Sequence, residues 1–419
     1  MKKLKIQGGH SLSGEIAISG SKNAALSIIA ASIMTEERIV LKNIPHLEDI
    51  TTMIRLIAGM GVSITLAEGN KLILDSSKIR NYLAPYDLVK TMRASILVLG
   101  PLIARFGEAT VSLPGGCAIG ARPVNLHLDG LKAMGAEIEI NDGYICAKTK
   151  KLKGTNFSFS PVSVTGTANL MMAAVLAEGQ SILENVAIEP EIISLGELLQ
   201  KMGGKIRGLG TRKITIDGVN KLYSAEHTII PDRIETGTFL VAAAITKSSV
   251  LLKKAQPEHL QSVLDFLSQT GALISFEEDK IELNMKERNI IPADFTTQPY
   301  PGIPTDMQAQ FMVLNAIARG NSIVIETIFE NRFMHVLELQ RMGADISLSG
   351  NTAYITGVKK LQSAPVMATD LRASAALVLA GLVADGETCI DRIYHIDRGY
   401  ECIENKLTFL GAKVARIET

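Results

Sequence analysis

A pattern of apolar and polar positions recurs six times along the chain. Each copy has an amphipathic stretch with apolar residues three or four positions apart, then a glycine, then a short β-branched or alternating run. The stretch predicts a helix, the glycine its left-handed cap, and the run a strand. The six glycines are 74, 68, 68, 72 and 68 residues apart: Gly61, Gly135, Gly203, Gly271, Gly343 and Gly411.

Each copy also contains a second stretch, made of small apolar residues with a polar start, as in "TGTANLMMAAVLAEG" and "TDLRASAALVLAGLVADG". These stretches are apolar nearly all round, so we expect buried helices that form the cores. A unit of about 70 residues is longer than a thin solenoid repeat of about 20 to 45. The pattern therefore predicts two globular α/β domains of three repeats each, divided near the polar stretch 223–231.

Composition narrows the class of protein. The 419 residues include 43 basic and 43 acidic side chains, a balance that argues against a general nucleic-acid or anionic-membrane binder. The four cysteines are far apart and form neither a metal-ligand cluster nor a disulfide framework. The first apolar run, residues 24–34, is too short for a membrane span and too late for a signal peptide. We expect a soluble, cytoplasmic protein without a metal.

The polar starts of the six buried helices are the first candidate site. Helix starts carry unpaired N–H groups and partial positive charge, so six starts facing one cleft would bind an anion. The alternative is ordinary capping and local ion pairs. Four cations at such starts oppose the helix dipole, which favours an anionic ligand: Lys22, Arg93, Arg233 and Arg372. Asp306, in "PYPGIPTDMQAQ", is either a capping acid or a proton acceptor.

The glycine-rich segment "LPGGCAIGARPVNLH" is the second candidate site. Cys117 lies there close to Arg122, and a nearby cation favours the reactive thiolate. The alternative is a small hydrophobe in a turn. "DRIYHIDRGYE", with Arg398, is either a cluster of functional residues or a solvated turn. Glycine-rich phosphate loops of the P-loop or Rossmann type are absent from the sequence.

Several blocks of the sequence resemble the UDP-N-acetylglucosamine 1-carboxyvinyltransferases of the enolpyruvyl transferase family. They run in family order from residue 20 to residue 405 and cover essentially the whole chain: "GSKNAAL", "VKTMRAS", "LPGGCAIGARPV", "PTDMQAQ", "ETIFENRFMHV", "TDLRASA" and "YHIDRGYE". The resemblance implies two inside-out α/β domains of three βαβαββ units, with helices buried and sheets outside. It also implies that the N-terminal strand joins the C-terminal domain, giving domains of residues 1–20 plus 232–419 and 21–231.

The resemblance implies transfer of the enolpyruvyl group of phosphoenolpyruvate to the 3′-hydroxyl of UDP-N-acetylglucosamine, with release of phosphate. This is the first committed step of peptidoglycan synthesis and needs no cofactor. Cys117 would be the proton donor, on a loop that closes over the site, and Asp306 the base. Phosphoenolpyruvate would be held by Lys22, Arg93, Arg122 and Arg398. The family is sensitive to the epoxide fosfomycin through this cysteine, so we expect the same here.

Further substrate contacts follow from matching positions. The segment along the uridine would be Arg122, Pro123, Val124, Asn125 and Leu126, and the diphosphate turn would be Ser163, Val164 and Thr165. The amino sugar would meet Thr305, Asp306 and Ile328, and the substrate-binding set would also include Asn23, Arg332, Asp370 and Arg372. Two positions depart from the family. The family commonly has "RPVDLH" where this chain has Asn125, and some members have lysine where it has Pro161.

Three other functions are alternatives to this one. A shikimate 3-phosphate enolpyruvyl transferase would share the fold, but its blocks differ and lack a cysteine on this loop. A non-catalytic paralogue that binds the sugar nucleotide should have lost Lys22, Cys117, Asp306 or Arg398, and all four are present. A structural scaffold of repeats would not need charged helix starts. The sequence does not give the oligomeric state.

Overall fold

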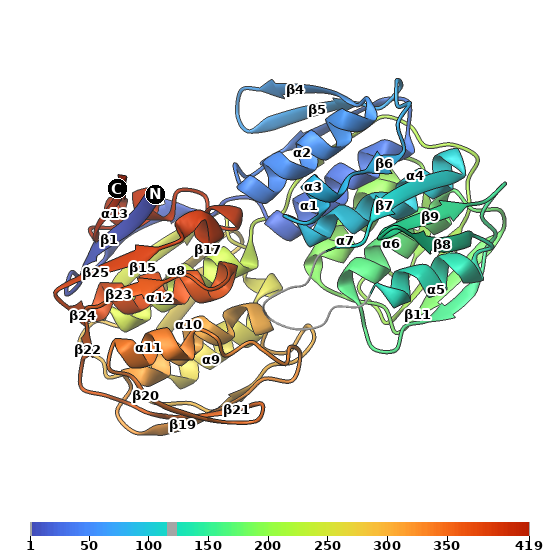
Figure 1. Cartoon of the computed structure of the whole chain (residues 1–419). Helices are drawn as coiled ribbons and strands as arrows, with labels where there is room; N and C mark the ends of the chain where they lie inside the picture. The colour runs from blue at the N-terminus through green and yellow to red at the C-terminus, as the bar shows by residue number, and fades with distance from the viewer. Residues whose placement is uncertain (1, 115–123, 419) are drawn as a thin grey trace. The chain divides into compact units, whose positions relative to one another are not determined.

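The computed structural model describes residues 2–114 and 124–418, which form two compact units (Figure 1). We call residues 2–19 and 231–418 the C-terminal unit, and residues 20–114 and 124–230 the N-terminal unit. Within the described residues, the chain passes between them at residues 19–20 and 230–231. Each unit has its own hydrophobic core.

The described residues of each unit contain three four-stranded sheets, all with the same strand directions. In each sheet, one edge strand runs parallel to the strand beside it, and the other two pairs of neighbouring strands are antiparallel. In the N-terminal unit the sheets are β14(Ala225–Thr228)-β3(Arg38–Lys42)-β5(Lys71–Asp75)-β4(Ser63–Ala67), β6(Leu83–Ala84)-β7(Glu108–Ser112)-β9(Tyr144–Lys148)-β8(Glu137–Asn141) and β10(Asn156–Ser158)-β11(Gln180–Glu184)-β13(Lys213–Asp217)-β12(Lys205–Arg207).

In the C-terminal unit, the first two strands of the chain complete two of the sheets. Ile16 in β2 lies opposite Leu252, and Leu4 in β1 lies between Ile390 and Arg416. The sheets are β2(Ser13–Ala17)-β15(Ser249–Lys253)-β17(Lys280–Asn284)-β16(Leu273–Glu277), β18(Phe295–Thr296)-β19(Asn321–Ile325)-β21(Thr352–Thr356)-β20(Asp345–Ser349) and β23(Pro365–Met367)-β25(Glu387–Asp391)-β1(Lys2–Gln7)-β26(Lys413–Glu418). A short pair, β22(Leu361–Gln362) and β24(Ala384–Asp385), is added.

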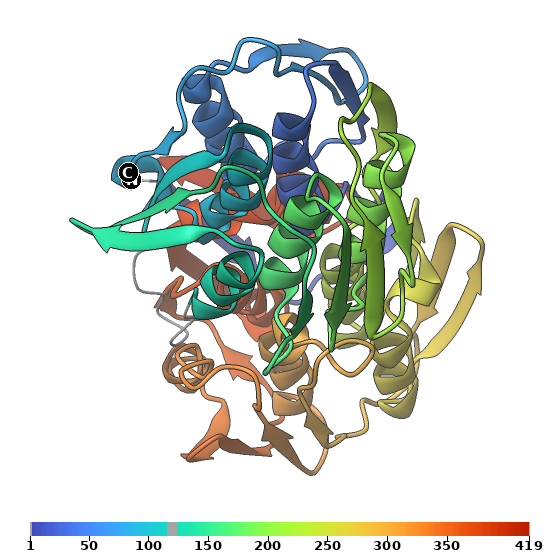
Figure 2. The same ribbon diagram turned by 90° about the vertical axis from the view of Figure 1, so that its right-hand side faces the viewer.

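The small apolar helices form the core of each unit, as predicted. Because they are apolar on every side, only the interior offers them enough apolar contact. Figure 1 shows α8, α10 and α12 inside the C-terminal unit, and Figure 2 shows strands around the helices of the N-terminal unit. The six are α1(Lys22–Ala31), α4(Leu99–Phe106), α6(Val164–Val175), α8(Arg233–Ile245), α10(Gln308–Ala316) and α12(Leu371–Val383).

The second set of helices is amphipathic, and each of its helices leads into one of the six predicted glycines. All six glycines have positive φ, between 85° and 108°, where a side chain would be strained. The predicted helix–glycine–strand repeat is therefore confirmed. These helices are α2(Glu48–Met60), α5(Asn125–Ala133), α7(Pro190–Lys201), α9(Gln261–Gln269), α11(Val336–Arg341) and α13(Ile403–Phe409).

Two buried helices begin differently from the prediction. Residues Arg93–Val98 form a 3-10 segment, η2, before α4, and Thr305–Met307 form another, η4, before α10. Pro101 has no N–H to donate to the carbonyl of Leu97, which removes one α-helical bond from this stretch. Arg93 and Asp306 thus lie on tighter turns that precede the α-helices.

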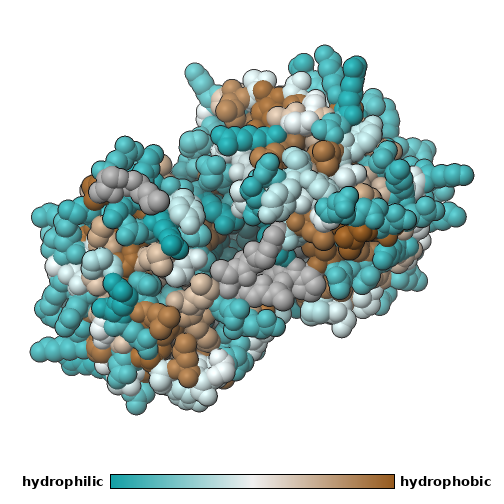
Figure 3. Space-filling view, in the orientation of Figure 1, coloured by the Kyte–Doolittle hydropathy of each residue, from teal (hydrophilic) through white to brown (hydrophobic). Residues whose placement is uncertain are grey.

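Apolar side chains also remain on the surface. Figure 3 shows brown patches separated by hydrophilic teal residues on the face in view. The most exposed large ones are Leu66, Leu337 and Phe409, which lie on three different elements. Within residues 2–114 and 124–418, no helix is long and apolar enough to cross a membrane.

Candidate active site

The carboxylate of Asp306 is held between two buried arginines of the C-terminal unit. Its Oδ1 accepts from Nη2 of Arg332 at 2.9 Å, and its Oδ2 accepts from Nε of Arg372 at 3.2 Å. The arginine side chains are 5% and 2% exposed, whereas Asp306 is 27% exposed. A buried guanidinium needs a counter-ion, and here both share the same one. An anionic substrate that engages these arginines would compete with Asp306 and free it to accept a proton.

Asp370 at the start of α12, Gln310 in α10 and Tyr400 support this charged cluster. Asp370 caps α12 by accepting from the N–H groups of Arg372 and Ala373 at 2.8 and 3.0 Å, so its carboxylate is a capping acid. Gln310 donates to the backbone carbonyl of Asp306 at 2.9 Å and to the hydroxyl of Tyr400 at 3.3 Å. The Arg372 guanidinium also lies 5.4 Å from the centre of the Tyr400 ring.

Glu326 organises the predicted contacts to the amino sugar, and the sequence analysis missed it. The hydroxyl of Thr305 donates to Glu326 Oε2, and the N–H of Ile328 donates to Oε1, both at 2.8 Å. The hydroxyl of Thr297 also donates to Oε1, and Glu326 is only 3% exposed. An acid directly after strand β19 was the available signal, but its partners lie up to 29 residues away in the sequence.

Arg398 ends the 3-10 segment η5(Ile393–Arg398) and is half-buried. Its neighbour Asp397 is fully engaged by Arg416, with distances of 2.7 and 2.9 Å. Burial, and then the charge of Arg398, lower the pKa of His395. The dense "YHIDRGYE" segment therefore contains a structural ion pair beside the predicted functional arginine.

In the N-terminal unit, Lys22 and Asn23 begin helix α1, and they differ in exposure. Lys22 is buried and its ammonium lies 3.2 Å from Oδ2 of Asp49, in the first turn of α2. Asn23 is exposed, and Arg93 at the start of η2 is half-buried. The anion that offsets Lys22 against the α1 dipole is thus within the protein. The same holds for Arg372 and Asp306, so each of these cations has an ion partner within the protein, and the anionic ligand stays a prediction.

The start of helix α6 also belongs to the predicted set. Ser163 caps it by accepting from the N–H of Gly166 at 3.1 Å. Val164 and Thr165 are exposed, and the Thr165 hydroxyl lies 3.2 Å from Nε2 of His127. Because the first N–H groups of a helix lack intrahelical partners, this turn is suited to an anion.

The predicted uridine and lid residues are only partly described. Cys117, Arg122 and Pro123 lie outside the described residues. Val124 and Leu126 are half-buried, and Asn125 is exposed as the first residue of α5.

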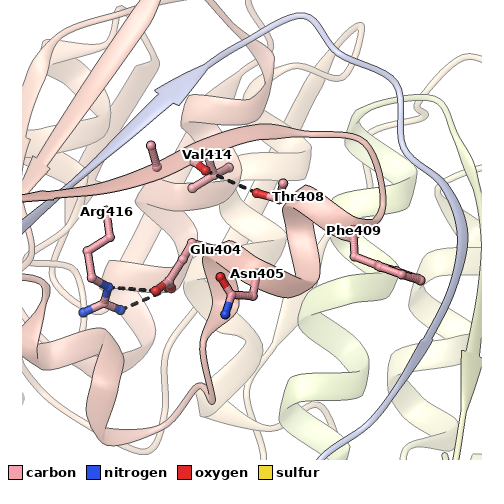
Figure 4. Close-up of a pocket in the computed structure, with 7 residues that line it drawn as sticks. Glu404, Asn405, Thr408, Phe409, Val414 and Arg416 are labelled. Carbon is pink, nitrogen blue, oxygen red and sulfur yellow. Dashed lines mark hydrogen bonds and ion pairs between the residues drawn. The ribbon is translucent and has the colours of Figure 1, made fainter.

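A pocket formed by α13 and β26 contains none of the predicted site residues (Figure 4). Arg416 there donates to both carboxylate oxygens of Glu404, at 2.7 and 3.1 Å. Its cation is thus already neutralised. Throughout the described part of the chain, no group of three acidic, histidine or cysteine side chains could hold a metal ion.

Comparison with known proteins agrees with this architecture. The family model of EPSP synthase (3-phosphoshikimate 1-carboxyvinyltransferase) matches residues 6–407. The enolpyruvyl transferase NikO from Streptomyces tendae superposes with a TM-score of 0.90 at 22% identity, covering 100% of this chain and 99% of NikO. EPSP synthase from Acinetobacter baumannii gives a TM-score of 0.79 at 18% identity, covering 100% of each chain. The fold is that of the enolpyruvyl transferases.

A curated relative is much more similar in sequence. UDP-N-acetylglucosamine 1-carboxyvinyltransferase from Halorhodospira halophila (strain DSM 244 / SL1) is 58% identical over 417 residues, covering 100% of both proteins. The chain belongs to the EPSP synthase family of carboxyvinyltransferases, and it is an enzyme of this class.

Proposed function

We propose that this enzyme transfers the enolpyruvyl group of phosphoenolpyruvate to the 3′-hydroxyl of UDP-N-acetylglucosamine, as a step of peptidoglycan synthesis. The observation that carries the proposal is the 58% identity, over both full lengths, to a relative that bears this activity in its name. The sequence also contains Cys117 and the charged residues that this chemistry needs.

The reaction has two halves, and both need proton transfer. Cys117 gives a proton to the vinyl CH₂ of phosphoenolpyruvate, the central carbon becomes electrophilic, and the sugar hydroxyl adds to it as its own proton is removed. Loss of a methyl proton and of phosphate then restores the double bond. Asp306 is the carboxylate proposed to accept protons, because it is partly exposed while its two arginines are buried.

The anionic groups of phosphoenolpyruvate are assigned to the cations. Lys22, Arg93, Arg122 and Arg398 bind its carboxylate and phosphate, and stabilise the charge on the departing phosphate. Arg332 and Arg372 move from Asp306 to the substrate as it binds. We also place the enzyme in the cytoplasm, since Cys146, Cys389 and Cys402 are free thiols.

The nucleotide is assigned to three sets of residues, one each for its diphosphate, its uridine and its amino sugar. The diphosphate binds at the α6 start through Ser163, Val164 and Thr165, and the uridine lies along residues 122–126. Thr305, Asp306 and Ile328 border the amino sugar, and Asn23 and Asp370 belong to the wider substrate-binding set. Asn125, where the family commonly has an aspartate, and Pro161, where some members have a lysine, would alter nucleotide affinity and leave the chemistry intact.

The acceptor is tested by phosphate release from phosphoenolpyruvate, with UDP-N-acetylglucosamine or shikimate 3-phosphate as the second substrate. We expect turnover with the sugar nucleotide alone and a loss of about 10²-fold or more in Cys117→Ala. Cys146→Ala, which changes a half-buried cysteine of β9, is the matched control and should keep wild-type activity. Turnover with shikimate 3-phosphate would refute the acceptor. Nucleotide binding without any turnover would favour a non-catalytic paralogue.

The cysteine is tested separately with fosfomycin. The thiolate of Cys117 should open the epoxide and form a stable thioether, with complete loss of activity. Peptide mass spectrometry should find the adduct on Cys117 and not on Cys146, Cys389 or Cys402. Retained activity with Cys117 unmodified would contradict this expectation.

A further inference from the structure

His127 is buried in helix α5 of the N-terminal unit, and both of its ring nitrogens have hydrogen-bond partners. It is 3% exposed. Its Nδ1 lies 2.9 Å from the side-chain amide nitrogen of Asn169, and its Nε2 lies 3.2 Å from the hydroxyl of Thr165. The ring therefore connects the buried side chain of Asn169, inside α6, to Thr165 in the exposed first turn of the same helix.

The side-chain amide of Asn169 has only one possible orientation. Its Oδ1 accepts from the N–H of Gly100 at 2.6 Å, and its Nδ2 donates to the carbonyl of Ile96 at 3.0 Å. Both backbone groups have fixed roles, so exchanging oxygen and nitrogen would break both bonds. Gly100 permits this approach, because a Cβ there would lie 2.3 Å from Oδ1.

This orientation fixes the tautomer of His127. Since Asn169 Nδ2 donates to Nδ1, that ring nitrogen must be an acceptor without a proton. The neutral ring then carries its proton on Nε2 and donates it to Thr165 Oγ1. Burial, and then the positive charge of Arg93, lower the pKa of His127 to about 4, which keeps the ring neutral at physiological pH.

We propose that His127 is a positioning residue for the sugar nucleotide, because it holds the Thr165 hydroxyl as a hydrogen-bond donor toward the diphosphate. This inference rests on the proposed function. Thr165 Oγ1 accepts from the ring, so its own proton is directed to another acceptor. A negatively charged diphosphate oxygen is such an acceptor, and the helix dipole also favours a negative charge at the first turn of α6. His127 acts through Thr165 and does not touch the substrate.

Two substitutions of His127 separate its donor from its acceptor. His127→Asn keeps an acceptor near Nδ1 for Asn169 but loses the donor to Thr165. His127→Gln reaches the Nε2 position with an amide donor. We expect His127→Asn to raise the KM for UDP-N-acetylglucosamine about tenfold, the effect of losing one hydrogen bond to a charged group. The kcat and the KM for phosphoenolpyruvate should change less than about threefold, and His127→Gln should restore most of the affinity.

His227 provides a matched control within the same unit. It is also 3% exposed, and its ring contacts Ser194 at 2.8 Å and Lys201 at 3.3 Å. Neither contact belongs to the proposed site. His227→Asn should change stability without changing the KM for the nucleotide. Equal KM changes in His127→Asn, His127→Gln and His227→Asn would show a purely structural role and overturn the proposal.

Two further measurements keep the proposal falsifiable if His127→Asn folds poorly. Thr165→Val should raise the nucleotide KM, and His127→Asn should add nothing to it in the double variant. Nitrogen-15 NMR of the wild type should show His127 as the neutral Nε2–H tautomer between pH 5.5 and 8. Additive effects, an Nδ1–H ring, or titration near pH 6.5 would overturn it. Failure of the proposed function differs, because wild type would then show no turnover with UDP-N-acetylglucosamine.

Discussion

The two units share one architecture but place different chemistry at their helix starts. The C-terminal unit gathers full charges, with Asp306 between Arg332 and Arg372. In the described part of the N-terminal unit, Lys22 is paired with Asp49 and Arg93 begins η2, whereas the start of α6 has neutral groups such as Thr165. The same set of buried helices thus supports both kinds of site, because a few polar residues at the helix starts, with loop residues such as Arg332, set the chemistry.

The comparison also predicts which unit is more sensitive to substitution. Breaking a buried ion pair leaves an uncompensated charge and costs about 3–5 kcal/mol, whereas a neutral hydrogen bond contributes only about 1 kcal/mol. Substitutions in the charged cluster should therefore have larger effects than those in the neutral one.

Asp306→Asn should have the largest effect. The substitution keeps the shape but removes the proton acceptor and the counter-ion of Arg332 and Arg372. We expect kcat to fall by about 10²–10⁴, the usual contribution of a general base, in a phosphate-release assay. Glu404→Gln, which changes a partly buried acid paired with Arg416, is the control and should stay near wild type. A kcat within tenfold of wild type for Asp306→Asn would remove Asp306 as the base.

Asp49→Asn tests the buried ion pair of the N-terminal unit. Lys22 would keep a hydrogen-bond partner but lose the negative charge of Asp49, so the free energy of unfolding should fall by about 3 kcal/mol. Urea unfolding measures this change. Asp87→Asn, in the exposed pair with Lys90, should leave the unfolding midpoint unchanged. An unchanged midpoint for Asp49→Asn would mean that this pair does not stabilise the fold.

Acid should destabilise the protein through its buried histidines. Burial lowers the pKa of His127, His227 and His335 to about 4. Between about pH 6.5 and pH 4 the unfolded state therefore binds more protons, and stability present above pH 6.5 is lost as the pH falls. Each histidine contributes at most about 1.4 kcal/mol per pH unit. Urea unfolding at pH 7.5, 6 and 5 should show this loss, and His127→Gln should reduce its slope.

Two cap glycines, one from each unit, should give the smallest effects. Gly343 in the C-terminal unit has φ +85°, and a Cβ there would make only an ordinary contact with Cγ of Gln362 at 3.9 Å, so Gly343→Ala costs only backbone strain, about 1 kcal/mol. At Gly61 in the N-terminal unit, φ is +108° and a Cβ would lie 2.7 Å from the carbonyl oxygen of Lys78. Gly61→Ala should therefore lower the urea midpoint more than Gly343→Ala. Equal midpoints would show that small movements of the backbone near Lys78 relieve the contact with the new Cβ at position 61.

Much of the fold could be predicted because it depends on local patterns. The six glycines and the apolar helices are signals within one stretch of chain, and the structure confirms both. The predicted helix starts at Arg93 and Asp306 were less accurate, because helix propensity does not distinguish 3-10 turns from α-helical turns. The proline at 101 was the available signal for the first of them.

The interactions of the site could not be predicted in the same way. His127, Asn169 and Glu326 act through partners 21 to 73 residues away, and a single sequence does not show such contacts. Asn169 lies within the apolar pattern of α6, and the pattern alone gives no reason to expect a functional role for a single amide there. The internal counter-ions of Lys22 and Arg372 were missed for the same reason.

The most direct test of the account is to identify the product formed from phosphoenolpyruvate and UDP-N-acetylglucosamine. We predict one phosphate released for each nucleotide converted, and a nucleotide that carries one enolpyruvyl group on the 3′-oxygen of its amino sugar, seen by mass spectrometry and proton NMR. Phosphate release without any change in the nucleotide, or attachment at another oxygen, would contradict the account.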